Sequence, residues 1–206
     1  MPIIKEIHIE KGLLLLWGIT EELDWLKQHF PFLATDRTFN SLKNARRQKE
    51  WLAVKMMLKQ IGCEDFKVYY NEKGQPQVKH HFYKNISISH SHEIAGIFLH
   101  PNKPVGLDIE SLGRNFAQVQ KKYLTAREIE LASRVENGNC LFWGAKEAVY
   151  KAAGVPGLHF ATQIALGFTP DSRLTATLIT GTATKTYHLD YFDQAQHLIV
   201  YLTDNE

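Results

Sequence analysis

The chain has little of several features that would assign it to other classes of protein. Its two cysteines, Cys63 and Cys140, are far apart and fit no metal-ligand spacing, so we interpret both as ordinary thiols of a reducing compartment. It has no charged start followed by a long apolar core, and Leu13 to Trp17 is too short for a signal or membrane segment. We therefore expect a buried strand there, no membrane association and a cytoplasmic location.

The chain also lacks a strong charge of either sign. A formal net charge of +2 is too small to argue for nucleic acid as a partner. Four basic residues do cluster in a predicted helix, where a solvated face is the favoured interpretation: Lys43, Arg46, Arg47 and Lys49. No glycine-rich phosphate loop of the Walker type is present, which counts against a nucleotide hydrolase.

What the chain does have is enough apolar sequence for a core, with 206 residues of which 44% are hydrophobic. Period-two alternation and helical spacing predict helices and strands in both halves. The helices are expected near 21–30, 40–61, 115–122, 126–136 and 140–153. The strands are expected near 13–17, 66–71, 86–91, 94–100, 105–110, 161–168, 173–180, 185–192 and 197–203.

Two carboxylates share one face of the predicted strand 105–110. Val105, Leu107 and Ile109 alternate with Gly106, Asp108 and Glu110. Such a pair raises the pKa of at least one member unless a cation lies between them, which favours an oxygen-seeking ion. Gly106 on the same face is expected to leave space for a ligand. An ordinary half-buried strand with a polar face is the alternative.

The helix predicted near 140–153 has one apolar face, formed by Leu141, Phe142, Ala145, Val149 and Ala152. Another face carries Trp143, Glu147, Tyr150 and Lys151, and the helix should end at Gly154. By themselves Glu147 and Lys151 could form a surface ion pair. Together with the acidic strand they could instead provide carboxylates and lysines for Mg²⁺ and phosphate.

A third segment, Ile86 to His92, makes the combination recognisable. In order and spacing the segments resemble the 4′-phosphopantetheinyl transferases, and in particular the larger two-lobed type that modifies many carrier proteins. Lys73-Gly74-Gln75-Pro76 matches a Lys-Gly-Lys-Pro turn except at Gln75, and Ser87 to Ser91 matches Asn-x-Ser-His-Ser except at Ser87. The residues that match without substitution are Asp108, Glu110, Lys146, Glu147 and Lys151. The resemblance covers roughly residues 37 to 160.

This resemblance implies an α+β fold with two similar helix-on-sheet lobes, related by pseudo-twofold symmetry, and the active site in the cleft between them. The N-terminal lobe would be residues 1–102, and the C-terminal lobe, which would carry the metal site, would be residues 103–206. A monomer is implied, because both sides of the cleft belong to one chain.

The implied reaction transfers 4′-phosphopantetheine from coenzyme A to a serine of an apo acyl or peptidyl carrier protein and releases 3′,5′-ADP. Asp108, Glu110 and Glu147 would hold Mg²⁺, with Mn²⁺ as an alternative. Glu147 would be the general base, and Lys151 would stabilise charge on the leaving group. Acidic carrier proteins would dock near Arg114 to Lys122.

The resemblance also implies contacts with coenzyme A. They come from the turn, the Ser-His-Ser strand, the acidic strand, the long helix and one arginine placed only by its spacing. The implied set is Arg37, Lys73, Gln75, Ser87, Ser89, His90, Asp108, Lys146 and Lys151. Thr125 and Glu128 first predict a capping box, with Glu128 as a second possibility near the metal.

Two other functions stay open. The chain could be a catalytically inactive module of the same fold that binds coenzyme A or a nucleotide, which the loss of a lysine at Gln75 makes conceivable. It could also be another Mg²⁺-dependent enzyme that acts on a diphosphate, since the acidic residues alone would permit that.

Overall fold

The computed structural model describes residues 3–63 and 67–205, and it shows the expected α+β fold. An N-terminal sheet has the order β1-β2-β6-β5 and a C-terminal sheet has the order β7-β11-β10-β9-β8, and every pairing is antiparallel. The strands of the N-terminal sheet are β1 (Ile3–Ile9), β2 (Gly12–Gly18), β5 (Asn85–His90) and β6 (Ile94–His100). Those of the C-terminal sheet are β7 (Leu107–Ser111), β8 (Ile164–Phe168), β9 (Leu174–Thr180), β10 (Ala183–Gln194) and β11 (His197–Asn205). A short ribbon pairs β3 (Val68–Tyr70) with β4 (Pro76–Val78).

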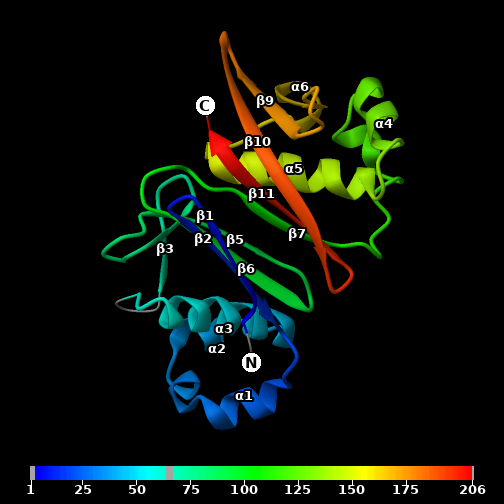
Figure 1. Cartoon of the computed structure of the whole chain (residues 1–206). Helices are drawn as coiled ribbons and strands as arrows, with labels where there is room; N and C mark the ends of the chain where they lie inside the picture. The colour runs from blue at the N-terminus through cyan, green and yellow to red at the C-terminus, as the bar shows by residue number, and fades with distance from the viewer. Residues whose placement is uncertain (1–2, 64–66, 206) are drawn as a thin grey trace.

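The helices are divided between the two sheets (Figure 1). In the first half they are α1 (Leu23–His29), η1 (Pro31–Ala34), α2 (Arg37–Ser41) and α3 (Ala45–Gln60). In the second half they are η2 (Gln120–Lys122), α4 (Ala126–Ala132), α5 (Gly138–Ala153) and α6 (Phe160–Gln163). The longest of them, α3 and α5, each lie on the outer face of one sheet.

The two sheets face each other, so that the layers run α3, N-terminal sheet, C-terminal sheet, α5 (Figure 1). Strand β2 shows why. Leu13 and Leu15 pack with α3, whereas Leu14 and Leu16 pack with Ile199 and other residues of the C-terminal sheet. An apolar run without alternation is the pattern of a strand covered on both faces. The expected buried strand at 13–17 is therefore confirmed.

Helix α5 approaches the C-terminal sheet unusually closely. A Cβ added to Gly106 would lie 2.0 Å from the carbonyl oxygen of Ala148 in α5. A Cβ added to Gly144 would lie 2.9 Å from Val200 in β11. The space at Gly106 is thus filled by the α5 backbone, and the expectation that it admits a ligand is wrong. The same contact holds α5 against the acidic strand.

Hydroxyl groups of β5 join the two halves of the chain. The Ser87 hydroxyl accepts a hydrogen bond from the Leu107 amide at 3.0 Å, and the Ser89 hydroxyl accepts one from the Ile109 amide at 3.1 Å. These bonds replace part of a strand ladder at the start of β7 and fix β5 beside the acidic strand. The turn between β6 and β7 contains the proposed domain boundary, which stays a prediction.

Several element boundaries differ from the expectation. Residues 115–122 form turns and the short η2 instead of a helix, because buried Phe116 anchors the segment against Trp143. The helix expected at 126–136 ends at Ala132, and residues 160–163 are helical before β8 begins. Strand β1 and the ribbon strand β4 were not anticipated. Residue 66, where one strand was expected to begin, lies outside the described residues.

Candidate functional site

The predicted metal ligands line one cavity of about 580 Å³ between the two halves. Asp108 and Glu110 come from β7 and Glu147 comes from α5, and the cavity also contains Ser89 and Lys151. The alternation of β7 places both acids on one side, as expected, while Leu107 and Ile109 are buried between the sheets. The structure therefore brings together residues that are 39 positions apart in the sequence.

Asp108 is buried, with 5% of its surface exposed, and only one of its carboxylate oxygens is satisfied. Its Oδ1 accepts hydrogen bonds from Lys151 Nζ at 2.7 Å and from the Ser89 hydroxyl at 3.1 Å. Its Oδ2 is buried and has no hydrogen-bond partner within residues 3–63 and 67–205. A buried carboxylate oxygen without a donor is costly, so the site favours a cation or donor at this atom.

Glu110, on the same side of β7, is held by Arg114 and Trp143. Arg114 donates to both carboxylate oxygens at 3.1 and 3.0 Å, and the Trp143 indole donates to Oε1 at 2.7 Å. Burial raises the pKa of Glu110, and the nearby Asp108 carboxylate raises it further. Arg114 also lies over the rings of Phe116 and Trp143.

Glu147 has the most perturbed carboxylate of the three. Burial raises its pKa to about 7, the charge of Asp108 adds to this effect, and Lys151 opposes it. A carboxyl group that titrates near neutral pH can accept and release a proton under physiological conditions, which is what a general base needs. The Lys151 ammonium donates to Asp108, Ser89 and the Leu107 carbonyl.

The three carboxylates fit a divalent cation, although they do not form a ready ligand cluster. No group of three acidic, histidine or cysteine side chains in the described part of the chain is close enough to bind one metal ion. Lys151 and Arg114 instead pair with Asp108 and Glu110. The donors are nevertheless of the type that Mg²⁺ binds, and Asp108 Oδ2 lacks a donor. Burial is the main cause of the raised pKa values of Glu110 and Glu147, and a cation would relieve the repulsion by Asp108 that adds to it.

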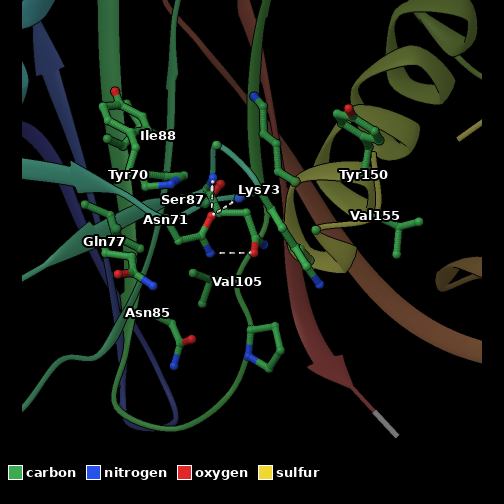
Figure 2. Close-up of a pocket in the computed structure, with 18 of the residues that line it drawn as sticks. Tyr70, Asn71, Lys73, Gln77, Asn85, Ser87, Ile88, Val105, Tyr150 and Val155 are labelled. Carbon is green, nitrogen blue, oxygen red and sulfur yellow. Dashed lines mark hydrogen bonds between the residues drawn. The ribbon is translucent and has the colours of Figure 1, made fainter. Parts of the chain in front are cut away.

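A second cavity, of about 390 Å³, opens beside the first and shares Lys151 with it. Figure 2 shows Tyr70 and Gln77 on one side of this cavity and Tyr150 and Val155 on the other. Five residues of the set implied for coenzyme A line it: Lys73, Gln75, Ser87, His90 and Lys151. The cavity therefore combines aromatic surfaces with polar and cationic groups from both halves of the chain.

The turn that carries Lys73 and Gln75 is organised by Asn71, as the dashed lines in Figure 2 show. The Asn71 amide oxygen accepts from the Lys73 and Gln75 backbone amides at 3.0 and 2.9 Å. The Asn71 amide nitrogen donates to Gln75 Oε1 at 3.1 Å. The Gln75 amide also packs against Gly154, where an added Cβ would lie 2.1 Å from Gln75 Nε2. Gly154 is the left-handed C-cap of α5, with φ of 59°.

A third cavity, of about 440 Å³, lies beside α3 and contains Trp51, Lys55 and Arg47. His90 and Ile88 line all three cavities, so the cavities meet at this part of β5. Burial lowers the pKa of His90, the Glu50 carboxylate opposes this effect, and the charges of Arg47 and Lys151 reinforce it. His90 therefore occupies the junction of a continuous cleft.

Comparison with known families identifies the superfamily of the chain. Residues 104–202 match the model of the 4′-phosphopantetheinyl transferase superfamily. The chain belongs to that superfamily. The matched region contains β7 and α5, and therefore all three carboxylates and Lys151. No curated protein matches the chain.

The structure places Lys146 away from the cavities that would hold the cofactor. Lys146 is fully buried, and its ammonium lies 2.8 Å from Glu128 Oε1 and 2.9 Å from the Phe160 carbonyl oxygen. Glu128 also accepts from the Leu166 amide and closes the predicted capping box with Thr125, which is confirmed. Lys146 and Glu128 thus form an internal ion pair outside the cavity that Glu147 lines. Glu128 is accordingly not in the carboxylate cavity.

The remaining residues that the sequence resemblance implies for coenzyme A differ in their surroundings. Ser87 lines the second cavity, but its hydroxyl already binds the Leu107 amide. Arg37 is exposed at the start of α2, and the third cavity is lined by its neighbours Asp36 and Thr38. The sequence did not indicate Asn71 or Glu50 for the site, and Arg46 was assigned to a solvated helix face, whereas it lines the carboxylate cavity. A signal for Glu50 was present in the sequence. It is an acid at a position that helical spacing places on the same buried stripe as the apolar residues Ala53, Val54, Met57 and Leu58.

No helix in the described residues has the length and apolar character that a membrane crossing requires.

Proposed function

We propose that this protein transfers the 4′-phosphopantetheine group from coenzyme A to a serine hydroxyl of an apo acyl or peptidyl carrier protein. The observation that carries the proposal is one cavity in which three carboxylates and Lys151 lie beside a second, cationic and aromatic cavity. Because both halves of the chain line these cavities, the protein is proposed to be of the larger two-lobed type. It would then act as a monomer, and we propose a cytoplasmic location.

In the proposed reaction the serine oxygen attacks the phosphorus that bears pantetheine. The new bond joins serine to that phosphorus, and the bond from the phosphorus to the 3′,5′-ADP oxygen breaks. Glu147 would accept the serine proton, because its carboxylate lies in the cavity on the same helix as Lys151. The Lys151 ammonium, which already lies in the cavity, would stabilise the charge that develops on the phosphate oxygens.

Asp108, Glu110 and Glu147 would hold Mg²⁺ or Mn²⁺ in this proposal. A divalent cation there would neutralise charge on the pyrophosphate oxygens. The residues of the chain prepare for it: Ser89 and Lys151 orient Asp108 through Oδ1 and leave Oδ2 for another partner. Trp143 fixes Glu110 through its indole N–H. Arg114 must leave Glu110 at least in part for that carboxylate to bind the cation.

The carrier protein is proposed to dock on the segment from Arg114 to Lys122. In this segment Lys121 and Lys122 are exposed, and Phe116 and Arg114 contact Trp143 at the edge of the carboxylate cavity. Cationic groups beside the site suit an acidic partner. Salt should weaken this docking. An apparent affinity for the carrier that stays constant between low and moderate salt would contradict this assignment.

Glu147→Gln tests the proposed chemistry most sharply. The variant keeps the size of the side chain but cannot accept the serine proton, so transfer should fall by a factor of about 10² to 10⁴. Binding of coenzyme A, measured by calorimetry, should be largely retained. Glu130→Gln is a suitable control, because Glu130 is an exposed helix residue outside the cavity. Near-normal turnover by Glu147→Gln would remove the assignment of Glu147 as the base.

A further inference from the structure

Glu50 of α3 is a buried acid surrounded by cationic groups. Only 2% of its surface is exposed. Its Oε1 accepts from Arg46 Nε at 2.7 Å, and its Oε2 accepts from Arg47 at 3.1 Å. The same Oε2 lies 3.3 Å from His90 Nδ1, which belongs to β5. One carboxylate thus connects two residues of a helix with a residue of the neighbouring sheet.

The three partners of Glu50 face different parts of the cleft. Arg46 lines the carboxylate cavity with Asp108 and Glu147, and Arg47 lines the third cavity. His90 lines all three cavities. The side chains of Arg46 and Arg47 are 56% and 60% exposed, so solvent and ligands reach them although their anchor is buried. They are therefore not simply part of a solvated helix face.

Contacts between the partners make the cluster more rigid. Arg47 also lies 3.1 Å from His90 Nε2. Because an arginine can only donate, Nε2 accepts this bond and the ring proton of a neutral His90 belongs on Nδ1. Nδ1 lies close to Glu50 Oε2 without the geometry of a hydrogen bond. Arg47 therefore orients the imidazole directly, and the Glu50 carboxylate does so through its bond to Arg47.

Stability alone is a weak reason for an acid at this position. Removing a carboxylate from water costs several kcal/mol, which a paired cation only partly recovers. The neighbouring positions on the same stripe of α3 are apolar, so an apolar residue would fit the helix face equally well. What Glu50 adds is orientation of three groups that point into the cleft.

We propose that Glu50 is a positioning residue that fixes Arg46, Arg47 and His90 so that they meet the phosphate groups of coenzyme A. This inference rests on the proposed function. Glu50 itself does not touch the co-substrate. Preset cations bind an anion better than flexible ones because less side-chain entropy is lost on binding.

Removal of Glu50 could also tighten the binding of coenzyme A, and this alternative makes the test decisive. Glu50 carries a negative charge, so removing it raises the positive charge of the cleft and by simple Coulomb attraction should tighten binding of an anion. A positioning role predicts weaker binding despite that added attraction. The sign of the change in affinity therefore separates the two explanations.

The test measures coenzyme A binding by calorimetry without metal or carrier, for the wild type, Glu50→Gln and Glu50→Asp. We expect Glu50→Gln to weaken binding by about tenfold and to raise KM for coenzyme A with kcat within about twofold. Glu50→Asp should recover part of the loss. Glu128→Gln is the matched control, because Glu128 is equally buried and ion-paired but away from the cleft. It should lower Tm and leave the affinity for coenzyme A unchanged.

Unchanged or tighter binding by Glu50→Gln, or the same loss in Glu128→Gln, would overturn the positioning role. If Glu50→Gln does not fold, the double variant Arg46→Gln/Arg47→Gln tests the same idea, since both side chains are mostly exposed. It should weaken coenzyme A binding at least as much, and wild-type affinity in it would also overturn the inference. Absence of binding by the wild-type protein would overturn the proposed function, and this inference with it.

Discussion

The Glu147 carboxyl group should make the protein less stable as the pH rises. In the unfolded chain this group ionises near its ordinary pKa of 4.5, whereas in the folded protein burial raises the pKa to about 7. Between these values the folded state binds more protons than the unfolded state. The free energy of unfolding therefore falls as the pH rises from about 4.5 to about 7, and the loss is complete above that range.

The size of the loss follows from the two pKa values. One pKa unit corresponds to about 1.4 kcal/mol, so the difference between 4.5 and about 7 amounts to about 3 kcal/mol at most. Glu147→Gln removes this titration but keeps the shape of the side chain. The variant should therefore exceed the wild type in stability by up to about 3 kcal/mol at pH 8, and by under about 0.5 kcal/mol at pH 4.5 from this effect.

The assay is urea unfolding of both proteins at pH 4.5 and pH 8, with a chelator present. For a chain of this size the gap at pH 8 corresponds to a difference in Tm of about 6–12 °C. Glu130→Gln, which changes an exposed acid, should show no such pH-dependent gap. Addition of Mg²⁺ should stabilise the wild type more than Glu147→Gln. A gap of equal size at both pH values would show that Glu147 is not held at a raised pKa, and the reasoning would fail.

Three further substitutions test particular contacts of the structure. Lys151→Met should lower the free energy of unfolding by about 3 kcal/mol, because it leaves the buried Asp108 carboxylate without its cation. Urea unfolding measures this loss, and an unchanged midpoint would contradict the pairing. Gly154→Ala should cost about 1–2 kcal/mol of stability, because residue 154 has a left-handed conformation. The added methyl group should also displace Gln75 and weaken coenzyme A binding in calorimetry, and full affinity would mean that Gln75 does not shape the cavity. Lys146→Met should destabilise the protein by about 3–5 kcal/mol, because it leaves the buried Glu128 carboxylate without its cation. The KM for coenzyme A should stay unchanged, and a raised KM would indicate that Lys146 contacts the co-substrate.

The sequence predicted most of the elements that build the site, because they follow simple periodicities. The alternation of Asp108 and Glu110 with apolar residues placed both acids on one side of β7. The helical spacing around Glu147 and Lys151 placed both on the cavity side of α5, and Gly154 ends that helix as expected. The apolar run from Leu13 to Trp17 also predicted a buried strand correctly.

What the sequence could not give was the contact made by each charged side chain. Lys146 and Lys151 are both lysines of one motif, yet the helix turns Lys146 toward Glu128 and Lys151 toward Asp108. Similarly, Gly106 was expected to face a ligand but faces the backbone of α5. These outcomes depend on tertiary packing between elements, which no local pattern encodes. The segment 115–122 was predicted as a helix, and this prediction is wrong. Its turns depend on the contact between Phe116 and Trp143, which lie far apart in the sequence.

The intact mass of an apo acyl carrier protein tests the central claim most directly. The carrier is incubated with this protein, coenzyme A and Mg²⁺, and a parallel sample contains a chelator. The account predicts a gain equal to one phosphopantetheine group, which the chelator abolishes. No gain on any of several apo acyl and peptidyl carriers, with measurable binding of coenzyme A, would contradict it and indicate a catalytically inactive binding module.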